Sequence, residues 1–183
     1  TDQAEALCPR GLLRRMVQKA EGMGFHCFAG LEYEFFVFDE NPKSIREKGY
    51  RNLTPITPGN FGYSVLRNTV WSDLYEQVLT MSRVMDFPIE GLHTETGPGV
   101  LEAALAVDEA VNAADKAALF KTFTKVLMQR NDVMATFMSK WSNDHAGQSG
   151  HLHMSLFDSN GKNVFYDAAS EHQMSKTMRS FLA

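Results

Sequence analysis

The sequence predicts an α+β fold in which an antiparallel sheet has helices packed on its outside. Segments dense in aromatic and aliphatic residues, often with polar residues at every second position, alternate with three amphipathic helix patterns. Short turns such as Thr96–Gly99 join neighbouring strand segments, which is typical of antiparallel pairing. The 183 residues are 44% hydrophobic and 22% charged, which suits one globular domain.

The first third of the chain predicts a helix, a strand and a loop. A helix is expected over 9–23, because Pro9 suits a first turn and Gly22 and Gly24 stop the apolar stripe. Residues 25–38 predict a strand or a hairpin that is buried on both faces at its far end. Residues 41–62 hold three prolines and predict a long loop.

The rest of the chain predicts further strands between two long helices and beyond them. The expected elements are a helix over 71–85, strands over 88–95 and 100–106, a helix from an N-cap at Asp108 to about Arg130, strands over 133–139 and 151–157, and a short strand over 163–166. The chain ends within a helical pattern and does not begin with Met, so a piece of a longer protein is expected.

Charge and hydropathy exclude several classes of protein. The net charge is −4 without a basic stripe, so no nucleic-acid partner is expected. The sequence has no run of 18 apolar residues, so no membrane helix is expected. The first 13 residues show no secretory pattern. Cys8 and Cys27 are too few for a zinc or redox motif, which indicates free thiols and a cytoplasmic protein.

Polar residues interrupt the predicted strands at unexpected positions. Because side chains alternate along a strand, Glu32 and Glu34 share one face and lie roughly 7 Å apart. Carboxylates on a buried strand are unfavourable unless a cation pairs with them, and this spacing suits two neighbouring cations. The alternative is a solvent-facing strip at the wet end of the strand.

The same pattern recurs on later strands. Glu95 ends an apolar strand, and Glu102 lies among alanines in the next strand, where a salt bridge to a lysine is the alternative. His151 and His153 share a face after a glycine-rich loop, although a strand histidine is often a hydrogen-bonded core residue. Four carboxylates with limited imidazole suit Mg²⁺ or Mn²⁺ better than zinc. Two or more such ions indicate phosphoryl transfer.

Three ordered motifs carry a family resemblance. They are LEYEFFVFD (31–39), HTETGPGVLE (93–102) and GHLHMSL (150–156). In this order and spacing they resemble the catalytic domain of the glutamine synthetase family. The resemblance implies an ATP-dependent ligase that joins the γ-carboxylate of glutamate to ammonia or an amine through a γ-glutamyl phosphate.

The resemblance also implies roles for particular residues. The expected ligands of a first Mg²⁺ or Mn²⁺ are Glu34, Glu95 and Glu102, and those of a second are Glu32 and His151. Glu90, His153 and Ser155 match nucleotide-binding positions, and Gly147 matches a position that contacts the amino-acid substrate. No residue of the chain is expected to transfer a proton, so the catalytic residues remain unassigned.

The chain departs from the family pattern in one loop. The family reads roughly Asn-Gly-x-Gly-x-His-x-His, where this chain has Ala146 for the Asn and Ser149 for the second Gly. This is similar to divergent members that join glutamate to organic amines, so a γ-glutamylpolyamine or other γ-glutamyl-amine ligase is an alternative. A non-catalytic structural homologue is a third possibility, which the intact ligand set disfavours.

The resemblance finally implies parts that residues 1–183 do not contain. A β-grasp domain is expected before them and the C-terminal part of the catalytic domain after them, so the fragment alone is expected to be inactive. The full-length protein is expected to form a homo-oligomer of stacked rings. Its partners are small molecules, namely ATP, glutamate and ammonia or an amine.

Overall fold

The computed structural model describes residues 7–183, and these form helices and an antiparallel sheet, which confirms the predicted fold class. The described residues divide into two compact units. One unit takes 7–30, 107–115 and 152–183, and the other takes 31–106 and 116–151. Residues 1–6, within the segment that lacks a secretory pattern, lie outside the described residues.

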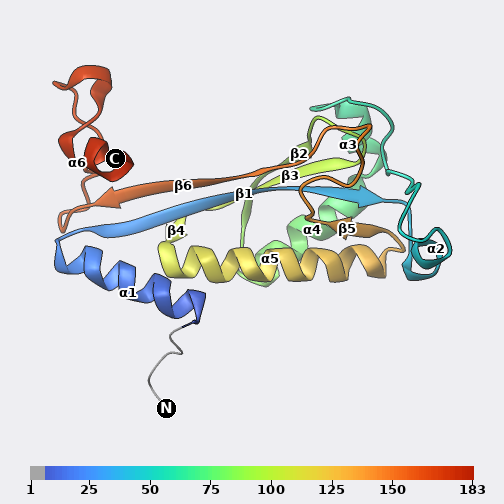
Figure 1. Ribbon diagram of the computed structural model, residues 1–183, viewed down its shortest axis with the longest axis horizontal. Helices are drawn as coiled ribbons and strands as arrows, with labels where there is room; N and C mark the ends of the chain where they lie inside the picture. The colour runs from blue at the N-terminus through green and yellow to red at the C-terminus, as the bar shows by residue number, and fades with distance from the viewer. Residues whose placement is uncertain (1–6) are drawn as a thin grey trace, which may run out of the picture. The chain divides into compact units, whose positions relative to one another are not determined.

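Figure 1 labels the helices and strands in the order in which they follow one another along the chain. The helices are α1 (Pro9–Gly22), α2 (Pro42–Glu47), α3 (Val65–Val70), α4 (Ser72–Val84), α5 (Ala110–Arg130) and α6 (Lys176–Leu182), with a 3₁₀ turn η1 (Glu171–Gln173). The strands are β1 (His26–Phe38), β2 (Ile89–Thr94), β3 (Val100–Leu105), β4 (Asp108–Glu109), β5 (Met134–Thr136) and β6 (Gly150–Phe157).

Strand β1 organises the sheet. Among the described residues the sheet has six strands, in the order β2-β3-β1-β4, and both β5 and β6 also pair with β1. Strands β1 and β3 are antiparallel from Glu32 opposite Ala104 to Phe36 opposite Val100. The strand or hairpin expected over 25–38 is therefore one long strand, His26–Phe38, and not a hairpin.

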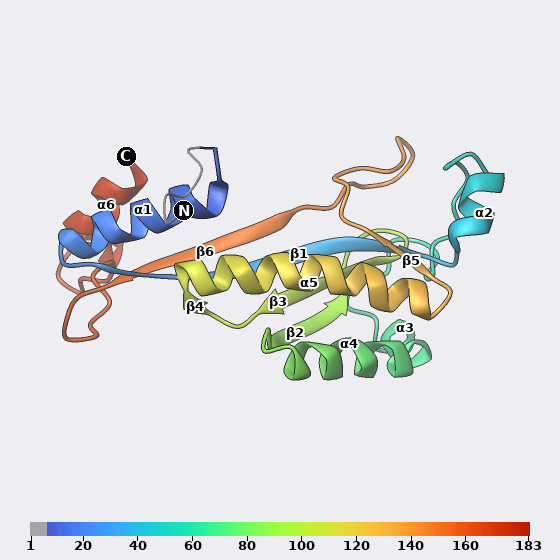
Figure 2. The ribbon, with the colours of Figure 1, turned by 90° about the horizontal axis from the view of Figure 1, so that it is seen from below.

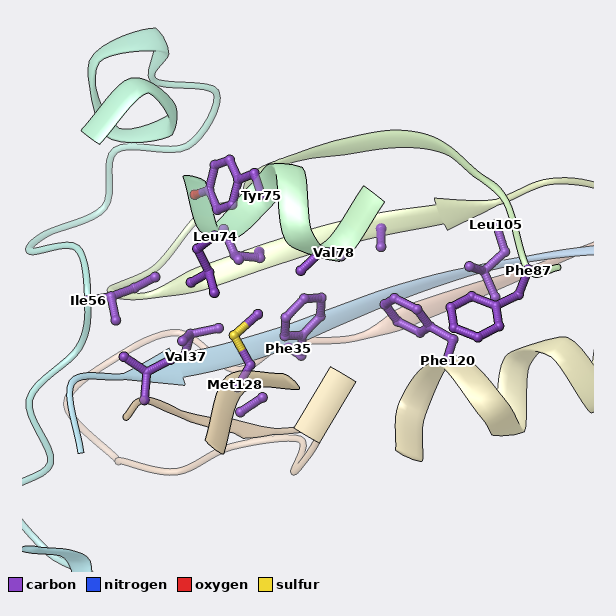
Figure 3. Close-up of a cluster of buried hydrophobic side chains, with 14 of the residues drawn as sticks. Phe35, Val37, Ile56, Leu74, Tyr75, Val78, Phe87, Leu105, Phe120 and Met128 are labelled. Atoms are coloured by element: carbon purple, nitrogen blue, oxygen red, sulfur yellow. The ribbon is translucent and has the colours of Figure 1, made fainter. Parts of the chain in front are cut away.

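The main core lies in the second unit, between the sheet and the helices α4 and α5, which cover one face of it (Figure 2). Figure 3 shows Phe35 and Val37 of β1 among side chains from both helices. Phe120 of α5 is fully buried there. On the opposite face of β1, Phe36 and Phe38 pack with Val100, so the far end of β1 is buried on both faces as the sequence predicts.

The expected loop over 41–62 contains helix α2. Asn41 caps this helix by accepting the main-chain N–H groups of Lys43 and Ser44, both at 3.0 Å. The proline at position 42 therefore starts a helix, because its missing N–H is not needed in a first turn. The carboxylate of the buried Glu40 accepts from the Ser44 hydroxyl at 2.6 Å, from the Thr54 N–H at 2.8 Å and from the Lys48 ammonium.

Two further expectations are wrong. Asp108 is not a helix cap, because it lies in β4 opposite Ala29, and α5 begins two residues later. Residues 163–166 form no strand; only isolated bridges hold them, from Asn163 to Phe157 and from Tyr166 to Met174. Separately, no helix in 7–183 is both long enough and apolar enough to cross a membrane.

Candidate metal centre

A row of polar side chains crosses three neighbouring strands of the second unit. Glu102 of β3 lies opposite His93 of β2 on one side and opposite Glu34 of β1 on the other. Directly opposed residues in a sheet bring their Cβ atoms within about 4.5–5.5 Å, on the same face. Glu102 is therefore the central member of the row.

Two groups of possible ligand atoms overlap at Glu102. Glu32, Glu102 and His151 form one group, and His93, Glu95 and Glu102 form the other. In each group, ligand atoms of the three residues lie within 4.8 Å of one another. The sheet thus places two potential cation positions side by side with one carboxylate common to both.

Specific contacts hold the imidazole rings against the carboxylates. His151 Nδ1 lies 2.9 Å from Glu32 Oε2. His93 Nε2 lies 3.1 Å from Glu102 Oε2 and 3.4 Å from Glu95 Oε1. Tyr63 stacks on the His93 ring, with the ring centroids 5.0 Å apart and the planes 16° from parallel.

The carboxylates differ in their electrostatic surroundings. Burial raises the pKa of Glu102, which is 8% exposed; His93 opposes this rise and the other three glutamates add to it. Burial acts on Glu95 in the same direction, but hydrogen bonds from the Tyr63 hydroxyl and the Thr96 N–H leave the pKa of Glu95 lowered. A negative field therefore concentrates around Glu102, where a cation would relieve it.

The donor set fits a hard divalent ion. Carboxylate oxygens dominate both groups, one imidazole completes each, and no cysteine takes part. Oxygen-rich sites of this kind suit Mg²⁺ or Mn²⁺, whereas a structural zinc site has more nitrogen or sulfur ligands. The crowding of partly exposed carboxylates around the buried Glu102 also favours the binding of cations.

The remaining residues that the sequence singled out lie at different places. Glu34 is in neither three-residue group; its carboxylate instead accepts from the Ser149 N–H at 2.8 Å. Glu90 is exposed on β2. His153 and Ser155 follow His151 on β6, and Gly147 lies in the loop that precedes this strand. The ligand and nucleotide assignments of these residues stay predictions.

Sequence reasoning missed three residues that the structure brings to the carboxylates. His93 could have been found, because it precedes Glu95 by two positions and so shares its face of the strand. Tyr63 and Ser149 reach the carboxylates from loops, where no periodic pattern indicates which way a side chain points.

Comparison with known proteins finds relatives that match nearly the whole chain. The chain matches the family described as glutamine synthetase, catalytic domain, over residues 6–183. It is 39% identical over 178 residues to type-1 glutamine synthetase 2 of Dictyostelium discoideum, covering 97% of this chain and 34% of that protein. It is 35% identical over 177 residues to glutamate–isopropylamine ligase of a Pseudomonas species, covering 97% of this chain and 39% of that protein.

A solved structure agrees in fold. Apo GmaS without ligand superposes with a TM-score of 0.86 at 23% identity, covering 99% of this chain and 41% of that one. The chain therefore spans between about a third and two fifths of the length of these relatives.

Proposed function

The chain belongs to the glutamine synthetase family, and from this we propose that residues 1–183 form the first part of the catalytic domain of an ATP-dependent carbon–nitrogen ligase. The ligase joins the γ-carboxylate of glutamate to ammonia or an amine through a γ-glutamyl phosphate. The proposal includes a β-grasp domain before this part and the rest of the catalytic domain after it, as the family resemblance implies; the relatives are longer than this chain.

The observation that carries the proposal is the pair of carboxylate–imidazole groups that share Glu102. Glu95 and Glu102, with Glu34 across the strand pair, hold the first Mg²⁺ or Mn²⁺ ion. Glu32 and His151 hold the second. Such ions neutralise the charge that develops on a phosphoryl group during transfer from ATP.

The chain's own residues orient the reactants around these ions. Glu90, His153 and Ser155 bind the nucleotide, and Gly147 binds the amino acid. A side chain at position 147 would not fit, because a Cβ there would lie 2.7 Å from the carbonyl oxygen of Ser139. The loop backbone can therefore lie this close to Ser139 only with glycine at this position.

An organic amine is the favoured co-substrate. The methyl group of Ala146 offers no hydrogen bond, whereas the Asn of the family pattern offers an acceptor and two donors. A hydrogen bond to a charged group contributes about 1.5–3 kcal/mol, so glutamate binding weakens by roughly one to two powers of ten. A larger amine contributes binding energy of its own. A relative named as a glutamate–isopropylamine ligase is consistent with this preference.

Steady-state assays of the full-length protein test the proposal. Phosphate release from ATP should require glutamate, Mg²⁺ or Mn²⁺, and an amine, with a higher kcat/KM for one or more organic amines than for ammonia. Glu32→Gln should abolish this turnover, while Glu76→Gln, on the exposed surface of α4, should retain it. Ammonia as the best nitrogen donor would remove the amine preference, and no glutamate-dependent turnover would refute the ligase.

A non-catalytic homologue is distinguished by calorimetry, since a scaffold should not bind Mn²⁺. The proposal includes a homo-oligomer of stacked rings, as the family resemblance implies. It also places the protein in the cytoplasm, which agrees with the two unpaired cysteines, Cys8 and Cys27.

A further inference from the structure

The loop that precedes β6 is held at several points against the rest of the second unit. The Gln148 N–H donates to the carbonyl oxygen of Ser139 at 2.8 Å, and its side-chain amide donates to that of Met138 at 2.9 Å. The Glu34 N–H donates to the carbonyl oxygen of Ser149 at 3.2 Å. Residues 147–149 and Gly150, the first residue of β6, which together we name the Ser149 loop, are therefore fixed relative to strand β1.

Close packing explains the glycine at position 150 of this loop. A Cβ atom on Gly150 would lie 2.8 Å from the carbonyl oxygen of Glu32. Real Cβ atoms do not approach main-chain oxygens this closely, so the loop can lie against β1 only with glycine at this position. The approach brings the main chain of Ser149 within reach of the neighbouring Glu34 side chain.

Both carboxylate oxygens of Glu34 are engaged by one residue. The Ser149 N–H donates to Oε2 at 2.8 Å, and the Ser149 hydroxyl lies 3.4 Å from Oε1. The first contact has the length of a charge-assisted hydrogen bond, and the second is long and weak. A carboxylate offers about four lone-pair sites, so about two remain available to another partner. Glu34 also lies opposite Glu102 across the strand pair.

We propose that Ser149 is a positioning residue of the metal centre, whose main-chain N–H holds the Glu34 carboxylate in the orientation that an ion requires. The inference rests on the proposed metal-dependent function and adds a residue to it. Fixing the carboxylate in advance reduces the rotamer entropy that Glu34 loses when an ion binds. Groups that orient metal ligands in this way typically contribute 10–100-fold to metal affinity.

The test is Mn²⁺ binding to the full-length protein by calorimetry and electron paramagnetic resonance, without substrates. Ser149→Pro removes the N–H donor and keeps the carbonyl acceptor, so it should weaken Mn²⁺ binding at least tenfold. Ser149→Ala removes only the distant hydroxyl, so its Mn²⁺ affinity should stay within about threefold of that of the wild type. The control is Ser142→Pro, which lies in the segment between β5 and β6. The Ser142 hydroxyl accepts from the Asp144 N–H, and within residues 7–183 it is not hydrogen-bonded to Glu34.

A double-mutant cycle with Glu34→Gln separates positioning from general damage to the loop. If Ser149 acts through Glu34, Ser149→Pro should have little further effect in the Glu34→Gln background. The same loss of affinity in both backgrounds, or no loss in either, overturns the role of Ser149. Wild-type protein that binds no Mn²⁺ would instead overturn the proposed function.

Amide hydrogen exchange gives a second measurement in case Ser149→Pro does not fold. The Ser149 amide should be protected in the wild type and exchange at least tenfold faster in Glu34→Ala. The Ser149 amide should stay protected when Mn²⁺ binds, because the same hydrogen bond orients the Glu34 carboxylate while it holds the ion. Loss of protection on Mn²⁺ binding would show that the ion displaces Ser149 from Glu34, and would overturn the proposal.

Discussion

Replacing Glu102 by Gln should stabilise the metal-free protein and remove most of its stabilisation by metal. Glu102 is a buried carboxylate whose pKa is raised, mainly by burial. Its ionised form therefore destabilises the folded state at neutral pH, and this destabilisation disappears as the pH falls through the raised pKa toward the unfolded value of about 4.3. The neutral amide has nearly the same shape and lacks this charge.

With metal bound, by contrast, the loss of Glu102 should cost stability, because the variant binds the ion more weakly. At a metal concentration of 100 times Kd, binding stabilises the wild type by about 2.7 kcal/mol. Glu102 supplies a ligand atom to both groups, so its loss should weaken binding by at least the factor of 10–100 that is typical of residues around a metal ligand. At the same metal concentration, the stabilisation then falls to between about 0.4 and 1.4 kcal/mol.

Thermal unfolding of the full-length protein, scanned with and without Mn²⁺ at pH 8, measures both effects. Glu102→Gln should melt higher than wild type without metal and show a smaller increase with metal. Glu76→Gln serves as the control, because Glu76 is exposed on α4 and belongs to neither ligand group. A lower melting temperature of metal-free Glu102→Gln, or a metal shift equal to that of wild type, would refute the reasoning.

Three further predictions concern stability. Burial pushes the pKa of Glu40 upward, but hydrogen bonds led by that from a lysine lower it to about 2, so the stability that Glu40 contributes is complete above pH ~4.3 and is lost as the pH falls toward 2. The melting temperatures of wild type and Glu40→Gln should therefore differ most near neutral pH and converge on acidification; a gap independent of pH would contradict this. Phe120→Ala should lower the free energy of unfolding by about 3–5 kcal/mol in urea denaturation, whereas Leu119→Ala, at a half-exposed neighbouring position, should change it far less. Gly150→Ala should lower the melting temperature and weaken Mn²⁺ binding, because its Cβ would collide with the Glu32 carbonyl; an unchanged Mn²⁺ affinity would show that the loop moves freely.

The sequence predicts the part of the site that follows from the alternation of side chains along single strands. Alternation places Glu32 and Glu34 on one face of β1, and it also separates Glu102 from Leu101 and Ala103. These local rules needed no knowledge of the pairing. The opposition of Glu34 and Glu102, by contrast, depends on the register between two strands that are far apart in sequence.

Other features depend on packing and long-range contacts, which the alternation of side chains does not indicate. Strand β2 has an irregular register between Ile89 and Gly91, which alternation alone does not indicate. The prolines of residues 41–62 predict a loop, although Asn41 followed by Pro42 is also a helix start. The contact of Ser149 with Glu34 joins positions 115 residues apart, and only the folded loop creates it.

Strand β1 connects the candidate site to the core through its two faces. Tyr33 and Phe35 lie on the face where Phe120 packs, with ring centroids 5.7 and 6.0 Å from that of Phe120. The side chains of Glu32 and Glu34 lie on the other face. A cluster of like charges destabilises the fold, so it requires a backbone that the surrounding packing already holds in place. The aromatic core supplies that rigidity at the residues that alternate with the carboxylates. Core and site should therefore separate experimentally: Phe120→Leu should lower stability and leave Mn²⁺ affinity nearly unchanged, whereas Glu102→Gln should do the reverse. A large loss of Mn²⁺ affinity in Phe120→Leu, under conditions where the protein stays folded, would show that the core also sets the geometry of the ligands.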